Sequence, residues 1–501
     1  MNSTLPAIAL FTPLVGAIVV LLTGKKPNLR EGVTLVTGGV LFAMVASMVG
    51  PVLDGKTLDV TLIQITPELP LALSVEPLGL IYALVASFLW IFNSIYSIGY
   101  MRKLYGTTSE GQTRYYTCFA VAIFSAIGIA FSGNLLTLFL FYEVMTFSTY
   151  PLVTHARTDA AFRSGRIYLG ILVGTSTLFF LAAMVWTWLI AGTLDFTPGG
   201  ILADKNVSAG HVMVLATLFF FGVGKTALMP FHMWLPNAMV APTPVSALLH
   251  AVAVVKAGVF TVLKISIAIL GLDLMQETGA GHLVAWFAAV TIILASLFAM
   301  AKDNLKARLA YSTIGQLSYI VLAAALATEA SVTGGSMHIA MHAFGKITLF
   351  FCAGAIYATA HKSNVSELAG IGKRMPITMF CFLVGALSTI GLPPFGGAWS
   401  KWFMVQGTLG APGTLDGEGI AFMVVLLVSS LLNIAYLLPI PIVAFFGKEK
   451  APEGDEKKHH ADHGEAPLLC RIPIMVTAAG CLALFIWPGM LQTLAAKALE
   501  H

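Results

Sequence analysis

Apolar runs of roughly 18 to 28 residues recur from one end of this chain to the other, separated by short polar joints. Each run is long enough to cross the hydrocarbon core of a bilayer, about 30 Å thick, as a helix, and all are longer than the strands of membrane barrels. Lipid satisfies no backbone hydrogen bonds, so only helices and closed barrels span it. The sequence therefore predicts an all-α, polytopic membrane protein.

Charged residues are scarce. Only 10% of the 501 residues are charged, against about 25% in soluble domains, which excludes a soluble protein. The first apolar run is followed by Lys25 and Lys26 rather than by a small-residue cleavage site, so we interpret it as a membrane span and not as a signal peptide. The net charge of +4 is explained by the membrane topology and gives no indication of nucleic-acid binding.

Hydropathy, with Gly and Pro as punctuation, predicts about fourteen spans. They lie at 4–23, 32–52, 75–99, 115–132, 134–153, 165–191, 211–229, 243–270, 282–301, 309–328, 334–360, 376–408, 416–446 and 472–494. Most of the 28 Lys and Arg residues fall in alternate joints, beginning with the first, whereas the opposite side holds only Lys56, Lys205 and Lys497. Cytoplasmic loops concentrate Lys and Arg, so we expect a bacterial cell (inner) membrane protein with both termini outside.

Two of these spans contain interruptions. Pro230 removes a backbone donor at the end of the seventh span, five residues after Lys225, and the twelfth span contains two prolines and three glycines from Gly391 to Gly397. Breaks at corresponding positions in two halves indicate an inverted repeat, here spans 4–8 and 9–13. The expected divisions are 1–114, an N-terminal three-helix segment; 115–270 and 271–447, the two five-helix repeats; 448–471, a cytoplasmic loop rich in histidine and charge; and 472–501, a C-terminal helix.

Ionisable side chains lie inside the predicted spans. They are Glu143, Lys225, Lys256, Lys264, Lys346 and Lys401. A lysine at the bilayer centre costs about 2.5 to 3.5 kcal/mol on insertion scales, and such residues mark ion and proton pathways. Glu143 is the only carboxylate deep in the chain, so we expect it to face Lys225 beside the first break. Lys264 lies near the end of its span, where it can instead extend its ammonium group to the membrane surface.

The spacing of these groups suggests a proton relay. His338, His342 and Lys346 recur every four residues and therefore share one face of a helix. We hypothesise that opening a Glu143–Lys225 pair sends a proton to Lys256, and that His250, His342 and Lys346 relay it to Lys401, with His338 on the same helix face. His232 lies beyond the proline break, where it either feeds protons or caps a helix.

No cofactor or metal is predicted. The five cysteines form no CxxC pair, and no phosphate loop, haem motif or iron–sulfur spacing is present. His338 and His342 match the spacing of zinc ligands, but no third ligand is evident. The loop that contains His459, His460 and His463 is typical of a solvated connector, with a proton antenna or metal site as the alternative.

Three motifs carry a resemblance to a known family. The run GKTALMPFHMWLPNAMVAPTPVSALLH, from Gly224 to His250, resembles a signature of the antiporter-like, proton-translocating subunits of respiratory complex I and of Mrp-type cation/proton antiporters. HAFGK, ending at Lys346, and GLPPF, beginning at Gly391, resemble later motifs of that family. The similarity covers nearly the whole chain. Lysine at position 401 and the chain length resemble the D-type subunits of Mrp antiporters most, although Tyr142 stands where tryptophan is frequent.

The resemblance implies a proton-translocating subunit of a multisubunit Na⁺ (monovalent cation)/H⁺ antiporter, assembled with other membrane subunits in the lipid bilayer. The alternative is the equivalent pumping module of complex I, or of a membrane-bound hydrogenase or formate-oxidising complex, in which case the chain is part of a redox-driven enzyme. A third reading is a quinone-binding or scaffolding subunit, which leaves the intramembrane charges unexplained. Since Glu143 is the only deep carboxylate, we expect this subunit to carry protons and the cation to pass elsewhere.

Overall fold

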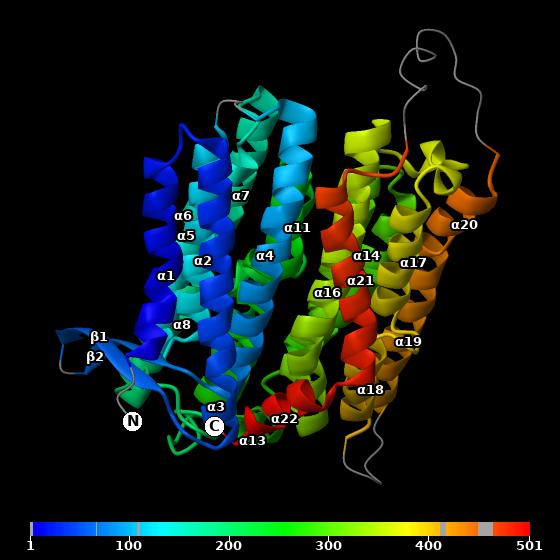
Figure 1. Cartoon of the computed structure of the whole chain (residues 1–501). Coiled ribbons are helices and arrows are strands. Elements are labelled where there is room, and N and C mark those ends of the chain that lie inside the picture. The colour runs from blue at the N-terminus through cyan, green and yellow to red at the C-terminus, as the bar shows by residue number, and fades with distance from the viewer. Residues whose placement is uncertain (1–3, 67, 108–110, 411–416, 449–463, 501) are drawn as a thin grey trace.

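The computed structural model describes residues 4–66, 68–107, 111–410, 417–448 and 464–500, with positions 249 and 250 described by backbone alone. Its long helices stand side by side in one bundle (Figure 1). The N-terminal part comprises α1 (Leu5–Leu22), α2 (Pro27–Ser47), α3 (Val49–Leu53), β1 (Asp59–Thr66), β2 (Leu69–Ser74) and α4 (Pro77–Tyr105). These are followed by α5 (Gln112–Ala130), α6 (Leu135–Val153), α7 (Asp159–Thr175), the π-helical turn η1 (Ser176–Phe180) and α8 (Leu181–Ala191).

The middle of the chain is more interrupted. It contains α9 (Ala209–Gly222), η2 (Gly224–Thr226), α10 (Trp234–Asn237), η3 (Ala238–Val240), α11 (Thr243–Ala247), η4 (Leu248–Val252), α12 (Val254–Ile265), η5 (Ser266–Leu270) and α13 (Leu272–Thr278). The remainder contains α14 (His282–Ala301), α15 (Leu305–Leu326), α16 (Glu329–Ala360), η6 (Val365–Glu367), η7 (Ile371–Lys373), α17 (Pro376–Ile390), α18 (Gly397–Thr408), α19 (Gly417–Leu437), α20 (Pro439–Phe446), α21 (Leu468–Ile486) and α22 (Gly489–Lys497).

Helices occupy every predicted span. By length and composition, eleven helices of the described chain can cross a membrane, or twelve if the pair Val254–Leu270 and α13, which meet at 82°, is one span. The apolar helices α9 and α17 are shorter because each ends at one of the two breaks. The prediction of a polytopic helical membrane protein is therefore confirmed, with two spans divided as the prolines and glycines indicated.

A β-hairpin departs from the all-α prediction. β1 pairs antiparallel with β2 in the joint between the second and third spans, with irregular register at two places. The Ser74 amide donates to Phe131 O at 2.7 Å, and the Asn134 side-chain amide donates to Pro70 O at 2.7 Å. The sequence signal was missed because irregular pairing blurs the alternation of apolar and polar residues on which strand prediction rests.

The centre of the bundle is α16. It packs against α15, α17, α18, α21 and α4, and nearly all of its residues are buried. The peripheral helices α1 and α2 bury only the stripe that faces their neighbours. The buried polar residues of α16, among them His338, His342 and Lys346, are therefore shielded by the neighbouring helices.

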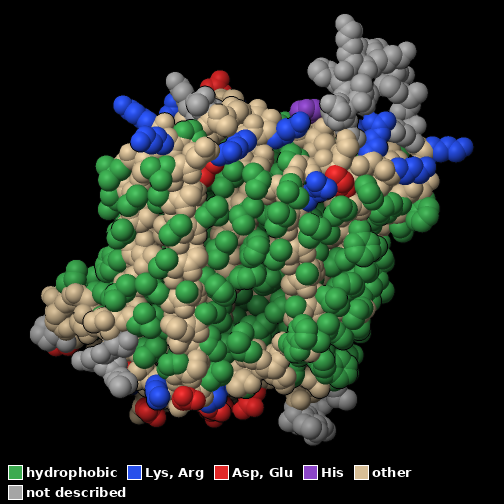
Figure 2. All heavy atoms as spheres, in the orientation of Figure 1, with side chains coloured by type: hydrophobic (Ala, Val, Ile, Leu, Met, Phe, Trp, Pro, Cys, Tyr) green, Lys and Arg blue, Asp and Glu red, His purple; other side chains and the backbone are tan. Residues whose placement is uncertain are grey.

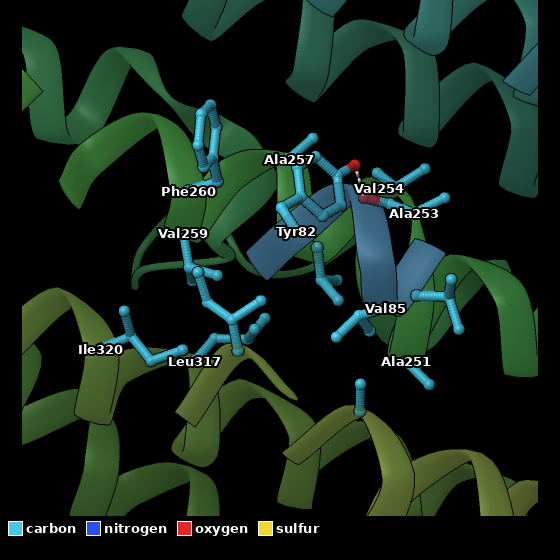
Figure 3. Packing of buried hydrophobic residues seen from close by; sticks show 14 of the residues in the cluster. Tyr82, Val85, Ala251, Ala253, Val254, Ala257, Val259, Phe260, Leu317 and Ile320 are labelled. Carbon is cyan, nitrogen blue, oxygen red and sulfur yellow. Dashed lines mark hydrogen bonds between the residues drawn. The ribbon is translucent and has the colours of Figure 1, made fainter. Parts of the chain in front are cut away.

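Buried apolar side chains of α12 pack against those of α4 and α15, and all three helices contact α16 (Figure 3). The ring of Tyr82 lies 5.5 Å from that of Phe260, and its hydroxyl donates to Ala253 O at 2.9 Å. Ala253 directly follows the π-helical turn η4, and its carbonyl also accepts the Ala257 amide at 2.9 Å. The Tyr82 contact therefore packs the core and joins α4 to the start of α12.

Both termini lie at one end of the bundle, which we call the termini face (Figure 1). Hydrophobic side chains cover most of the side that faces the viewer, and the Lys and Arg side chains visible there gather mainly at the opposite end (Figure 2). This is the segregation expected of a protein whose apolar belt lies in lipid and whose cationic loops lie on one side.

A remote carboxylate caps α17. Glu465 Oε1 accepts the amides of Ile377 and Thr378 at 2.7 and 3.1 Å, and Oε2 accepts the Thr378 hydroxyl at 2.9 Å. Glu465→Ala removes these acceptors and should lower the free energy of unfolding by about 0.5–2 kcal/mol, measured as a lower thermal midpoint in detergent. Glu465→Gln, which keeps an acceptor oxygen, should lose less, and equal midpoints for all three proteins would contradict the capping role.

Candidate functional site

The first break places Lys225 against α6. After α9 ends at Gly222, the chain forms only the short turn η2, and Ala227 adopts a left-handed conformation with φ 54°. Gly258 of α12 lets the break approach closely, because a Cβ there would lie 2.6 Å from the Lys225 carbonyl carbon. Lys225, which is completely buried, is thus fixed between α12 and α6.

Neutral groups of α6 hold the Lys225 side chain. Its Nζ donates to Tyr142 O at 2.8 Å and to Thr146 Oγ1 at 2.6 Å, and lies 3.1 Å from the centroid of the Tyr142 ring. The backbone amide of Lys225 donates to the Tyr142 hydroxyl at 3.2 Å. An ammonium group over an aromatic face is favourable, more so when it is desolvated.

Glu143 follows Tyr142 in α6 and lies next to this cluster, but its carboxylate is not paired with Lys225 among the described residues. Oε1 of Glu143 is buried and has no hydrogen-bond partner among the described residues. The charge of Glu143 acts on Lys225, but the two side chains form no ion pair in the described part of the chain. The expected neighbourhood of Glu143 and Lys225 is therefore present, with the pair in an open arrangement.

Lys256 contacts the histidine stripe of α16. Its Nζ hydrogen-bonds His342 Nδ1, while His342 Nε2 is buried without a partner among the described residues. The rings of His342 and His338 are stacked with centroids 5.6 Å apart. His338 in turn contacts Ser400 Oγ at 2.8 Å and Gln316 Oε1 at 3.1 Å, so this face of α16 connects α12 to α18.

Lys346 lies one turn further along α16. Its Nζ donates to Ser312 Oγ at 2.5 Å, and the same oxygen accepts the hydroxyl of Tyr436 at 2.7 Å. Lys346 is completely buried and forms no ion pair within the described residues. Within the described chain, this ammonium is therefore held by a hydroxyl group and not by a carboxylate.

The Lys401 side chain lies at the second break. Nζ donates to Ile390 O at 2.8 Å and to Ser430 Oγ at 3.3 Å, and lies 4.7 Å from the Tyr319 ring. Gly391, with φ 92°, leaves space that a Cβ would take from the Lys401 side chain. A cavity of about 810 Å³, lined mainly by apolar residues such as Trp399 and Trp402, reaches Lys401 from the side.

His250, a predicted site residue, and Lys264, whose role the sequence left open, differ from the others. His250 lies in the turn η4, but its side chain is outside the described residues. Lys264 does not extend to the membrane surface: it is buried and forms an ion pair with Glu76. The expectation of an extended Lys264 is therefore wrong, because Glu76, one residue before α4, supplies a counter-charge that sequence reasoning did not consider.

The hydrogen bond made by Lys306 was not predicted from the sequence. Its place between two spans predicts a cationic loop residue, yet its Nζ donates to Ala241 O at 2.7 Å, just before α11. His232 lies within the segment between the first break and α10, with Nδ1 3.3 Å from Pro230 O. The loop with His459, His460 and His463 lies outside the described residues.

The elements that carry these groups contact one another one after the next across the bundle. The break at η2 contacts α12, α12 contacts α16, and α16 packs extensively against α18. Lys225, Lys256, His342, Lys346 and Lys401 thus form a row of buried titratable groups across the bundle, which we call the buried row. Glu143 lies at its α6 end.

Sequence comparison agrees with this arrangement. The family described as NADH:quinone oxidoreductase/Mrp antiporter, transmembrane region, matches residues 132–432, from the start of α6 into α19. The chain belongs to this family. The matched region contains every member of the buried row.

Relatives in this family include subunits of quinone oxidoreductases. The chain is 32% identical to chloroplastic NAD(P)H-quinone oxidoreductase subunit 5 of Zygnema circumcarinatum over 345 residues, 65% of this chain and 47% of that protein. It is 29% identical to NADH-quinone oxidoreductase subunit N of Desulforudis audaxviator over 435 residues, 83% of this chain and 82% of that protein. The chain thus spans about half the length of the subunit 5 relatives.

Two solved structures share the fold. A chain of the Mrp complex from Dietzia sp. DQ12-45-1b superposes with a TM-score of 0.84 at 19% identity, covering 99% of this chain and 97% of that one. A chain of the archaeal membrane-bound sulfane sulfur reductase superposes with a TM-score of 0.83 at 24% identity, with the same coverage.

Gly258 offers a test of how the first break is positioned. Gly258→Ala would push a methyl group into the backbone of Lys225, and overpacking of this kind costs about 1–3 kcal/mol. We expect a lower thermal midpoint in detergent. Gly170→Ala is the matched control, because Gly170 is also helical and a Cβ there meets nothing within 4 Å. Identical midpoints for both variants would show that the close contact at Gly258 is unimportant.

Proposed function

We propose that this chain is a proton-translocating subunit of a multisubunit Na⁺ (monovalent cation)/H⁺ antiporter, equivalent to the D-type subunits of Mrp complexes. The observation that carries the proposal is the buried row. Lys225, Lys256, Lys346 and Lys401 are buried, and none forms an ion pair within the described residues. Desolvated ammonium groups without counter-charge are costly, so such a row is suited to groups that gain and lose protons.

Glu143 supplies the variable charge for the first step. Unit charges 4 Å and 10 Å apart interact with about 4 and 1.7 kcal/mol at an effective dielectric of 20. Movement of Lys225 from its neutral acceptors on α6 to the Glu143 carboxylate therefore stabilises its ammonium form, and separation of the pair favours release of the proton. The described arrangement, with Lys225 on Tyr142 and Thr146, corresponds to the separated state.

The histidine stripe of α16 carries the proton onward. Lys256 donates to or accepts from His342 Nδ1, and the unpartnered Nε2 of His342 leaves its second nitrogen available for exchange. His338 joins the stripe to Ser400, the residue before Lys401. The proposed transfer runs from Lys256 through His342 and Lys346 to Lys401, with His250 as a further participant. The Lys256–His342 hydrogen bond supports its first step, and Lys346 lies one helical turn after His342 on the same face of α16.

The two breaks support a pair of inverted five-helix repeats. In this division, residues 115–270 contain the first break with Lys225 and residues 271–447 contain the second with Lys401. Each break lies beside a buried lysine held partly by a backbone carbonyl, Tyr142 O or Ile390 O. Irregular backbone at membrane depth is tolerated where it lines a polar pathway.

Partners and orientation complete the proposal. The similar Mrp and sulfane sulfur reductase chains come from membrane complexes, and the quinone oxidoreductase relatives are named as subunits, which supports assembly with other membrane subunits. We place the chain in a bacterial inner membrane with the termini face outside, because Lys and Arg gather at the opposite end. Na⁺ would pass through another part of the assembly, since the buried row contains no carboxylate and Glu143, at its α6 end, is assigned to Lys225.

A second candidate is the pumping module of a redox complex. It is favoured by the similarity to NADH-quinone oxidoreductase subunit N along 82% of that protein. The buried row would work in the same way, with electron transfer elsewhere as the driving force. Genes for small antiporter subunits beside this one would support the antiporter, whereas genes for iron–sulfur or NADH-binding subunits would support the redox complex.

Removing either Glu143 or Lys225 should abolish transport. We expect Lys225→Ala and Glu143→Ala to stop cation-driven proton movement by the complete complex in vesicles, measured with a pH-sensitive dye, because the variable charge or its partner is lost. Assembly of the complex should be unchanged.

Lys205→Ala is the matched control, since Lys205 is an exposed lysine outside the bundle core, and it should transport normally. Full transport by either the Lys225 or the Glu143 variant would contradict the proposed relay. A complex that transports cations but no protons would reject the function itself.

A further inference from the structure

An ion pair lies behind the wall of a cavity at the termini face. Lys264 of α12 pairs with Glu76, the residue that precedes α4. The side chains are 5% and 18% exposed, so the lysine is the more deeply buried partner. The Phe196 ring lies 4.6 Å from Lys264 Nζ and closes the pair off from another side.

The cavity has a volume of about 520 Å³ and is lined by groups of the β-hairpin and its neighbours. Asp59, Thr61, Ser74, Glu76 and Phe196 are among its lining residues, whereas Lys264 is not. Glu76 therefore borders the cavity and also contacts the lysine. A cavity with this many polar groups can hold water.

Lys264 is also connected to the buried row by its helix. It lies eight residues after Lys256 on α12, or about 12 Å along the axis. The Thr261 hydroxyl lies between them, bonded to Ala257 O. The π-helical turns η4 and η5 flank α12, and such turns are frequent at functional sites.

We propose that Lys264 and Glu76 form the terminal proton-exchange pair through which the buried row communicates with the aqueous phase at the termini face. This rests on the proton-translocating function proposed above. In the outward direction, an N–H bond of the Lys264 ammonium breaks as an O–H bond forms on Glu76. Water in the cavity then takes the proton from Glu76, and the neutral amine is reprotonated from the Lys256 side. One proton leaves the row, and both side chains return to their starting states.

Burial lowers the free-energy cost of proton transfer from Lys264 to Glu76. A buried ion pair gives up the hydration of both charges, and its mutual attraction only partly compensates that loss. Proton transfer within the pair replaces two desolvated charges by a neutral amine and a neutral acid, which cost less to bury. Exposure of Glu76 to the cavity then favours its ionised form again, because water solvates the carboxylate.

Arginine distinguishes this role from a purely structural one. A structural ion pair would join α12 to α4, and arginine would serve it at least as well because its guanidinium binds carboxylates in two-point fashion. Arginine, however, stays protonated in proteins and cannot pass on its proton. The two roles therefore predict opposite results for Lys264→Arg.

The experiment compares variants in the complete complex, with proton movement in vesicles and assembly both measured. We expect Lys264→Arg and Glu76→Gln to assemble normally and to lower the transport rate by about a hundredfold or more, the lower end of the range for loss of a positioned proton-transfer group. Lys497→Arg is the matched control on the termini face, because Lys497 donates to Leu53 O at 2.9 Å and forms no ion pair among the described residues, and it should transport normally.

Normal transport by Lys264→Arg would overturn the proposal and assign the pair a structural role. Normal transport by Glu76→Gln would overturn it as well. If either variant fails to assemble, Lys264→Gln combined with Glu76→Gln, a neutral pair that retains hydrogen bonding, takes its place, and normal transport by that double variant overturns the proposal. Loss of transport in Lys225→Ala with retention in Lys264→Arg would reject only the exchange pair, whereas absence of proton movement in the unmodified complex would reject the function beneath it.

Discussion

The solvation of buried ammonium groups by neutral acceptors is the constraint on which this structure depends. Lys225 is held by Tyr142 O and Thr146, Lys256 by His342, and Lys401 by Ile390 O and Ser430. Such acceptors keep an ammonium group in place without fixing its charge as a carboxylate would. The buried row can therefore change protonation without losing its architecture, and Lys264, with a carboxylate partner, stands apart from it.

The breaks in the seventh and twelfth spans serve this solvation. A continuous helix uses its carbonyl groups internally, whereas an interrupted one leaves carbonyls such as Ile390 O free to accept from Lys401. Gly391 and Gly258 provide the room that the lysine chain and the irregular backbone require. The glycine residues and the interrupted helix therefore act together to accommodate a buried lysine and to provide an acceptor for its ammonium group.

Much of this could be predicted because lipid imposes simple rules. Apolar length predicted the spans, and the proline and glycine runs predicted both breaks. The hairpin was missed because it lies outside the apolar runs that carried the prediction, and its irregular register weakens the alternating pattern. Lys264 was interpreted wrongly because its counter-charge, Glu76, lies almost two hundred positions earlier in the chain. No local pattern connects the two residues.

The sequence by itself determined the membrane-spanning helices, the interruptions and the identity of the ionisable groups, because hydropathy and backbone chemistry act over neighbouring residues. Only the tertiary structure decided which of these groups meet: Lys256 with His342, His338 with Ser400, and Lys264 with Glu76. It also showed Glu143 beside Lys225 without an ion pair. Contacts between helices depend on the packing of side chains from distant segments, and that packing is a property of the whole bundle.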